Sequence, residues 1–273
     1  MTSPEVVKKT AEERSFLVKT PTELFSLLDS LKKQGMAKGV GYDVFGTVVT
    51  SLYSRQEQNV LLAHSVAEYY EREKGKRLSE EEIGVCYTRK RDAIKNSRNP
   101  VIILGEEVTQ KQQECSEAEV ITAVGRELGI RDIPSLISYV EQEWLQFDLV
   151  NTRPVVGMVE LLAKSIALFG QEHVGLYSNN SCSSNHILSL LERCGYLGNG
   201  LINARNVMVS SEFGLKEYGI GIRKPNPLAF GGFSLRLGLL PSEIAFAGDG
   251  GNDVLFATNS GSNGIKLISQ ANL

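Results

Sequence analysis

The sequence predicts an α/β fold with two parts: a doubly wound parallel sheet, and a block of helices inserted after the first strand of that sheet. Short apolar runs alternate with helical patterns after residue 152, which is typical of a parallel sheet covered by helices. An isolated apolar run, Gly39–Phe45, ends at Gly46-Thr47 as a buried strand would. Between these two regions, residues 55–151 have helical patterns and no clear strand signal.

Length and composition exclude several classes of protein. The 273 residues are 42% hydrophobic and 22% charged, as in a globular protein of one or two domains. The net charge of −3 argues against a nucleic-acid partner, and no apolar run is long enough to cross a membrane. The N-terminal residues lack the apolar segment of a signal peptide, and the four cysteines form no CxxC pair. We therefore expect a cytoplasmic protein with a small-molecule substrate.

Three regions follow from these patterns. Residues 1–36 are predicted to form an N-terminal helical extension, because Thr20-Pro21-Thr22-Glu23 has the form of a capping box and an apolar helix face follows. This extension could form a homodimer surface or cover an edge of the sheet. Residues 37–54 and 152–273 form the predicted core, and residues 55–151 form the predicted helical cap domain.

Helix signals recur along the cap. Asn59–Glu73 ends at Gly75, which can adopt the backbone conformation that stops a helix. Two more capping boxes begin at Ser79 and Ser116, and Ile133–Phe147 is a last amphipathic segment.

In the predicted core, helix patterns alternate with strand patterns. Helices are predicted over Val155–Phe169, Asn185–Cys194, Pro227–Leu237 and Asn252–Asn259, and strands over Val174–Tyr177, Leu201–Val209, Ile244–Gly248 and Gly264–Ile268.

Polar residues stand where the predicted strands end. Asp43 lies in the first apolar run, Ser178-Asn179-Asn180 follow the second, and Asp249 and Asp253 follow the fourth. Lys224 precedes a helix between the third and fourth. Because parallel strands bring their carboxyl ends to one edge, these groups are expected to converge there. A carboxylate nucleophile, paired carboxylates for Mg²⁺, and a lysine with a hydroxyl suit phosphoryl chemistry.

The order of these motifs resembles the haloacid dehalogenase (HAD) superfamily of hydrolases. Asp-x-x-Gly-Thr, a strand ending in Ser, Lys-Pro and Gly-Asp-x-x-x-Asp occur in that order, over residues 39–53 and 152–268. The resemblance implies a Rossmann-like core, and the helical block falls where this superfamily inserts its cap between the first and second motifs.

The resemblance also implies a role for each matching residue. Asp43 would attack the substrate and form a covalent aspartyl intermediate, while Ser178 holds the transferring group and Lys224 balances its charge. Mg²⁺ would be the cofactor. The implied metal ligands are Asp43, the carbonyl of Phe45, Asp249 and Asp253, and the implied substrate-binding residues are Thr47, Asn179 and Asn180.

One position departs from the phosphatase pattern. Phosphatases of this superfamily usually carry an acid two residues after the nucleophile, but this chain has Phe45, which cannot donate a proton. A 2-haloacid dehalogenase, a phosphonate hydrolase that uses a cap lysine, and a binding protein without turnover are therefore alternatives. Asp249 and Asp253 favour the phosphatase, because carboxylates next to a third carboxylate need a cation.

The cap also carries a run of basic residues. We expect this run to be a solvated helix face, which would bind an anionic substrate if it pointed into the cleft. Arg55 is likewise expected at the surface, with contact to a substrate carboxylate as the alternative. The run consists of Arg89, Lys90, Arg91, Lys95 and Arg98.

Overall fold

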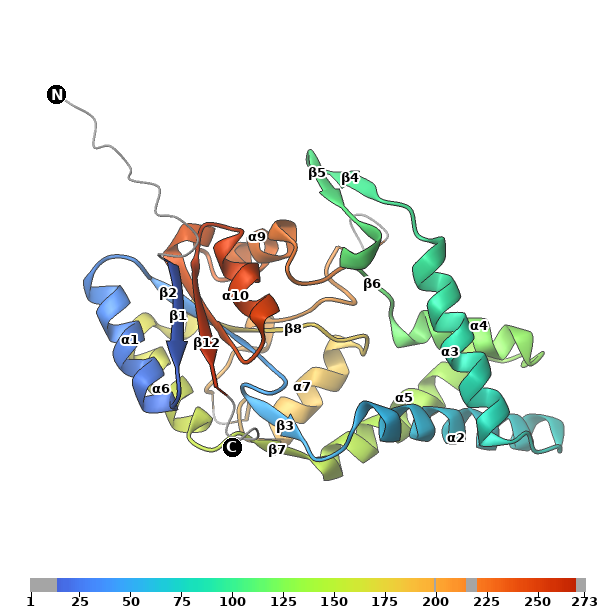
Figure 1. Ribbon diagram of the computed structural model, residues 1–273. Coiled ribbons are helices and arrows are strands. Elements are labelled where there is room, and N and C mark those ends of the chain that lie inside the picture. Colours follow the sequence, from blue (N-terminus) through green and yellow to red (C-terminus); the bar gives the residue numbers. More distant parts are fainter. Residues whose placement is uncertain (1–13, 199, 215–219, 269–273) are drawn as a thin grey trace.

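The computed structural model describes residues 14–198, 200–214 and 220–268, and its core is a sheet of six parallel strands (Figure 1). The strand order is β1-β12-β11-β2-β8-β9, and every neighbouring pair is parallel. This confirms the predicted doubly wound, Rossmann-like α/β fold. The strands are β1 (Ser15–Val18), β2 (Gly39–Asp43), β8 (Val174–Ser178), β9 (Val207–Val209), β11 (Ile244–Gly248) and β12 (Asn263–Leu267).

Helices cover the sheet on both faces (Figure 1). On one face α1 packs against α6, which also contacts β2 and β8; on the other, α9 packs against α10, which contacts β11 and β12. The core helices are α1 (Pro21–Lys33), α6 (Met158–Phe169), α7 (Ser184–Arg193), α9 (Pro227–Arg236) and α10 (Gly251–Thr258).

An aromatic cluster fills the space between the sheet and the α9–α10 layer. Phe233 of α9 contacts Tyr177 of β8 and Phe246 of β11, with ring centroids 6.0 and 5.9 Å apart. Gly41 of β2 makes room for this cluster, because a Cβ there would overlap the Phe233 and Phe246 rings. Packing of these buried aromatic side chains thus stabilises β2, the strand that ends at Asp43.

The residues between β2 and β8 form a separate helical lobe. It consists of α2 (Arg55–Lys74), α3 (Glu80–Ser97), α4 (Glu117–Glu127) and α5 (Ile133–Asn151). The predicted capping boxes are confirmed at Ser79 and Ser116, where the side-chain and backbone bonds of each box are both present. Gly75 ends α2 at φ 66°, as predicted.

Two strand ribbons join the lobe to the core. The first lies at the connections between them, where β3 (Val49–Ser51) pairs antiparallel with β7 (Thr152–Pro154). The second crosses from one part to the other, because β6 (Gln113–Glu114) of the lobe pairs with β10 (Gly221–Ile222) of the core. The lobe is therefore held over the carboxyl edge of the sheet at two places.

The structure corrects three details of the sequence-based prediction. Ser15–Val18 is a strand where a helical extension was expected, because this segment pairs with β12 and thereby extends the sheet. The rest of the predicted extension either forms α1 against the core or, over residues 1–13, lies outside the described residues. Val101–Ile103 (β4) and Glu106–Val108 (β5) form a hairpin inside the supposedly all-helical lobe.

The hairpin turns at Leu104-Gly105, where both residues have positive φ. A leucine at this position gives no turn signal in the sequence. The third correction concerns residues 201–209, of which only the last three form a strand. Among the described residues, no helix is both long and apolar enough to span a membrane.

Replacing the central ring of the aromatic cluster tests this account of the core. Phe233→Ala is expected to lower the free energy of unfolding by about 3–5 kcal/mol, because the side chain is 0% exposed and its removal leaves a cavity. The measurement is urea unfolding followed by circular dichroism.

Leu235→Ala is the matched control on the same helix. Leu235 is 76% exposed, so its loss should change the unfolding free energy by less than about 0.5 kcal/mol. Equal losses in the two variants would show that the α9–α10 layer does not stabilise the sheet as described.

Candidate active site

The side chains that the sequence predicts to be catalytic or to bind metal stand at or next to the carboxyl ends of adjacent parallel strands. Asp43 is the last residue of β2, and Ser178 is the last residue of β8, with Asp43 in register with Tyr177. Asp249 follows β11 directly, and Asp253 lies in the first turn of α10. Three segments that are distant in sequence therefore meet at one edge of the sheet.

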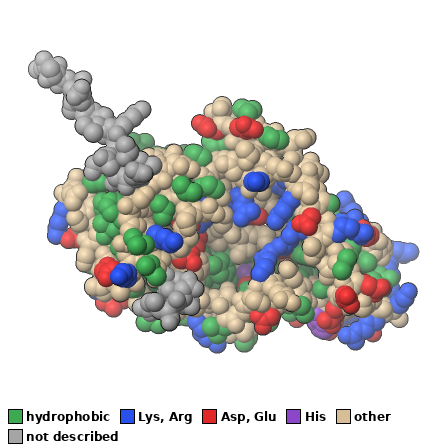
Figure 2. Space-filling view, in the orientation of Figure 1, with side chains coloured by type: hydrophobic (Ala, Val, Ile, Leu, Met, Phe, Trp, Pro, Cys, Tyr) green, Lys and Arg blue, Asp and Glu red, His purple; other side chains and the backbone are tan. Residues whose placement is uncertain are grey.

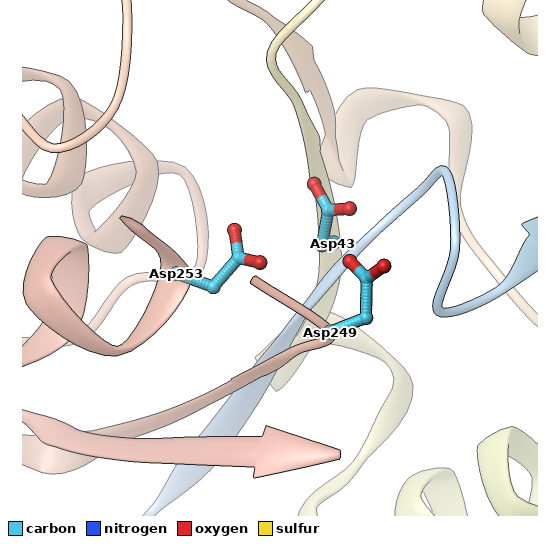
Figure 3. A group of neighbouring side chains, drawn as sticks. All are labelled: Asp43, Asp249 and Asp253. Carbon is cyan, nitrogen blue, oxygen red and sulfur yellow. The ribbon is translucent and has the colours of Figure 1, made fainter. Parts of the chain in front are cut away.

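Three carboxylates converge at this edge (Figure 3). One oxygen from each of Asp43, Asp249 and Asp253 lies within 4.8 Å of the other two. Asp43 and Asp253 are buried and Asp249 is partly exposed. Clustered carboxylate oxygens with one accessible side are a donor set that suits a hard divalent cation. The residues present therefore fit a metal ion.

Lys224 inserts its ammonium group between two of these carboxylates. Its Nζ lies 2.5 Å from Asp43 Oδ1 and also donates to Asp253 Oδ1. The rings of Tyr177, Phe246 and Phe256 surround the same nitrogen, with centroids 5.3 to 5.9 Å away. The cation is thus held by charge pairing and by cation–π contacts in a position with almost no exposure to water.

Burial changes the proton affinity of the cluster. Burial, followed by the charge of Asp253, raises the pKa of Asp43 to about 7 even though Lys224 opposes the shift. Burial and the charge of Asp253 also raise the pKa of Asp249. Burial lowers the pKa of Lys224, but the charges of Asp43 and Asp253 outweigh it and raise that pKa overall. One lysine does not neutralise three carboxylates, so a further cation is favoured here.

The backbone around the cluster is shaped to admit these carboxylates. Gly46 has φ 80°, and a Cβ at this position would fall on the Asp249 carboxylate. A Cβ at Gly248 would likewise overlap the Asp253 carboxyl group. The amide of Gly250 donates to Asp253 Oδ2 at 2.9 Å, which fixes the orientation of that side chain.

Two predicted hydroxyls are buried without hydrogen-bond partners. Ser178 Oγ and Thr47 Oγ1 are both enclosed and unpaired. An unpaired buried hydroxyl is costly, so a group bound at the site would supply the missing partner. The Ser178 hydroxyl therefore has the property expected of a contact to a bound ligand.

The remaining predicted residues are tied into the same loops. Asn179 Oδ1 accepts a bond from the backbone amide of Lys224 at 2.9 Å, so this side chain joins the two loops. Asn180 Oδ1 accepts a hydrogen bond from the backbone amide of Cys182, and this bond does not use the side-chain nitrogen of Asn180. Phe45 is half-buried, and its role as a carbonyl ligand stays a prediction.

A cationic pocket of about 180 Å³ lies between the core and the lobe and is lined in part by the loop that follows Ser178. Figure 2 shows Lys and Arg side chains gathered around the hollow between the two parts. The pocket begins at Asn179, one residue after Ser178. Its lining residues are Arg55, Arg91, Lys95, Glu114, Cys115, Asn179, Asn180, Ser181 and Arg223.

The basic run of α3 divides between two environments. Arg89 and Lys90 pair with Glu127 on the outside of the lobe, as a solvated face would. Arg91 and Lys95 instead line the pocket, together with the half-exposed Arg55. The prediction of one solvated face is therefore wrong for Arg91 and Lys95. These two residues lie about one helical turn apart, on the side of α3 that faces the core.

Sequence reasoning did not identify four residues that build this pocket. Arg223 stands next to Lys224, and a basic pair before a helix is a usable signal. Glu114, Glu117 and Ser181 give none, because single acids near a helix cap and a serine in a polar loop are ordinary surface residues. In the structure Glu114 and Glu117 are buried and Ser181 is partly buried.

Comparisons with known proteins gave matches among solved structures. No protein-family model and no curated protein sequence matches the chain. Many of the solved structures that match with high probability are HAD hydrolases.

Three of these structures illustrate the range of activities. A predicted phosphoglycolate phosphatase from Haemophilus somnus is 18% identical over 86% of each chain, with a TM-score of 0.43. An L-2-haloacid dehalogenase from Xanthobacter autotrophicus with covalently bound chloropropionic acid is 18% identical over 86% of this chain and 80% of its own, with a TM-score of 0.43.

A HAD family hydrolase from Deinococcus radiodurans with bound phosphate and sodium is 15% identical over 87% of this chain and 94% of its own, with a TM-score of 0.40. At these identities and TM-scores, the likeness fixes neither the reaction nor the substrate of this chain.

Metal binding at the carboxylate cluster is directly measurable. Adding Mg²⁺ to the protein in EDTA-treated buffer is expected to stabilise the fold by about 2.7 kcal/mol at a hundredfold excess over the dissociation constant. Asp249→Asn should remove this stabilisation, because it takes one carboxylate from the cluster. The readout is the melting temperature by calorimetry.

Asp29→Asn is the control for this measurement. Asp29 pairs with Lys33 on the surface of α1, so its loss should leave the Mg²⁺-dependent shift unchanged. A shift that persists in Asp249→Asn would contradict metal binding at the cluster.

Proposed function

We propose that this protein is a HAD-like, Mg²⁺-dependent phosphohydrolase that acts on a small phosphorylated metabolite. The observation that carries the proposal is the cluster of Asp43, Asp249 and Asp253, with Lys224 bonded to two of its members. A dehalogenase needs a free nucleophilic carboxylate but no group of three. Three clustered acids instead favour a reaction that uses a cation.

Asp43 is the nucleophile in this proposal. One of its oxygens forms the bond to phosphorus as the bond from phosphorus to the leaving oxygen breaks, which gives an aspartyl-phosphate and an oxyanion. The oxyanion then takes a proton from water to give the alcohol. Water then attacks the phosphorus and releases inorganic phosphate and the free carboxylate. Lys224 orients Asp43 and favours its charged form against the effect of burial, since its ammonium contacts the same carboxylate.

A bound Mg²⁺ would supply positive charge that stabilises the negative charge on the phosphoryl oxygens and on the attacking carboxylate. Asp43, Asp249 and Asp253 would hold it, with the Phe45 carbonyl as the further proposed ligand. The buried Ser178 hydroxyl and the amides of Asn179 and Asn180 would donate to the phosphoryl oxygens, and Thr47 would contact the substrate. These groups position and neutralise the phosphoryl group.

The helical lobe acts as the cap in this proposal. Its strand β6 pairs with β10 of the core, and the Glu117 amide donates to the Ser181 carbonyl at 2.9 Å. A lobe docked in this way restricts the access of water to the carboxylate cluster, which strengthens the electrostatic interactions there.

Hydrolysis of p-nitrophenyl phosphate tests the proposed reaction. The wild-type protein is expected to release p-nitrophenol with Mg²⁺ and not with EDTA, and Asp43→Asn should lower turnover by at least about 10³-fold because the nucleophile is lost. Asp29→Asn should match the wild type.

Release that is insensitive to EDTA and to Asp43→Asn would contradict the proposal. Halide release from 2-haloacids in the presence of EDTA would instead establish the dehalogenase alternative.

The aromatic residue at position 45 generates a prediction about leaving groups. Since Phe45 cannot protonate the departing oxygen, aryl and acyl phosphates should be hydrolysed faster than alkyl phosphates. Phe45→Asp should raise kcat on alkyl phosphates by about 10²-fold, as a general acid does. Steady-state kinetics on matched aryl and alkyl esters provide the measurement.

Phe45→Asn serves as the control, because the asparagine side chain has nearly the same shape as that of aspartic acid but no acidic proton. An equal gain in both variants would show that space at position 45, and not proton donation, limits the reaction.

A further inference from the structure

The pocket between lobe and core is strongly cationic for its size. Arg55, Arg91, Lys95 and Arg223 line it, and Glu114 is the one acid in the lining of this pocket. These cations come from three separate elements, α2, α3 and the loop after β10. Side chains of like charge repel one another, so their convergence costs free energy unless an anion is bound between them.

Two of the arginines are held in place from below by a buried acid. Glu117 is 0% exposed, and its Oε1 accepts from Arg91 and from the Ser181 hydroxyl, and lies 3.6 Å from Arg55 Nη2. Glu117 Oε2 is buried without a partner. The single charge of Glu117 is thus shared between two guanidinium groups, which leaves positive charge directed into the pocket.

The other two cations are less engaged. Within the described ranges Lys95 forms no ion pair, and it is partly buried at the pocket wall. Arg223 Nε lies 3.6 Å from Glu114 Oε2, which is longer than a hydrogen bond, so its donors are largely available. Burial, followed by the neighbouring charge of Arg91, lowers the pKa of Arg55, while Glu117 and Glu114 oppose this shift.

The pocket is joined to the carboxylate cluster by two short links. Asn179 and Asn180 form part of its wall and follow Ser178, and Arg223 precedes Lys224. A small molecule with its phosphoryl group at Asp43 would therefore extend into the cationic pocket. The pocket volume of about 180 Å³ admits a group of a few heavy atoms.

We propose that Arg55, Arg91, Lys95 and Arg223 bind a second anionic group of the substrate, a carboxylate or a second phosphate. This inference rests on the proposed phosphohydrolase function and names its substrate class: small phosphate esters with an anionic tail. Guanidinium groups bind both kinds of oxyanion through paired, charge-assisted hydrogen bonds.

Three aryl phosphates that differ only in the tail provide the test: phenyl phosphate, para-carboxyphenyl phosphate and para-phenylene bisphosphate. The wild type is expected to favour at least one charged tail over phenyl phosphate by about tenfold or more in kcat/KM. Lys95→Gln and Arg55→Gln should each reduce that preference by about tenfold. The tail with the larger preference identifies the group as a carboxylate or a phosphate.

Lys90→Gln is the matched control, because it removes the same charge from the same helix at a residue that pairs with Glu127 outside the pocket. It should keep the wild-type preference. Melting temperatures check that all variants fold. A preference that is absent from the wild type, or equal in wild type and both pocket variants, overturns the inference while the proposed function stands.

A second readout does not depend on turnover. With EDTA present, inorganic phosphate should raise the melting temperature of the wild type and of Lys90→Gln, and the rise should be lost in Lys95→Gln and Arg55→Gln. If no ester is hydrolysed but this pattern holds, the pocket binds anions and the proposed reaction is wrong. If no ester is hydrolysed and this melting-temperature pattern is also absent, the inference and the proposed function fall together.

Discussion

Burial of the Lys224 ammonium group is the constraint on which the candidate site depends. A cation with almost no exposure is stable only when it is paired, and Asp43 at the end of β2 and Asp253 in the first turn of α10 provide that pairing. The aromatic rings around Lys224 belong to the same cluster that packs α9 and α10 onto the sheet. The hydrophobic core therefore fixes the position of the Lys224 cation, and the cation orients the Asp43 carboxylate.

The second constraint is the attachment of the lobe. A helical insertion joined only by β3 and β7 could move relative to the core, but β6 pairs with β10 and Glu117 bonds to Ser181 through its backbone and its side chain. The core residues that make these contacts lie close in the sequence to Ser178 and Lys224. The same contacts therefore attach the lobe and complete the wall of the pocket.

The sequence was a good guide to the carboxyl edge of the sheet. Asp43, Asp249 and Asp253 could be placed together because the geometry of parallel strands is regular and these residues stand where apolar runs end. Lys224 could be added because it precedes a helix between the third and fourth predicted strands. It was a poor guide where a distant partner decides the structure. Ser15–Val18 becomes a strand only because β12 offers an edge, and the hairpin at Leu104-Gly105 lacks the usual turn residues.

The same limit applies to the pocket, and it explains how one helix can carry two kinds of basic residue. Arg89 and Lys90 meet Glu127 within the lobe, whereas Arg91 and Lys95 meet the core only through the docked interface. Charge counts along a helix cannot separate these cases, because the partner of each side chain is set by tertiary packing.

Phe45 is the opposite case, because its chemistry follows from the sequence alone. No arrangement of neighbouring residues gives a phenyl ring an acidic proton to donate. In the proposed reaction, an acid that assists the leaving group therefore comes from another position than residue 45, and Glu114 is the one acid in the wall of the adjoining pocket.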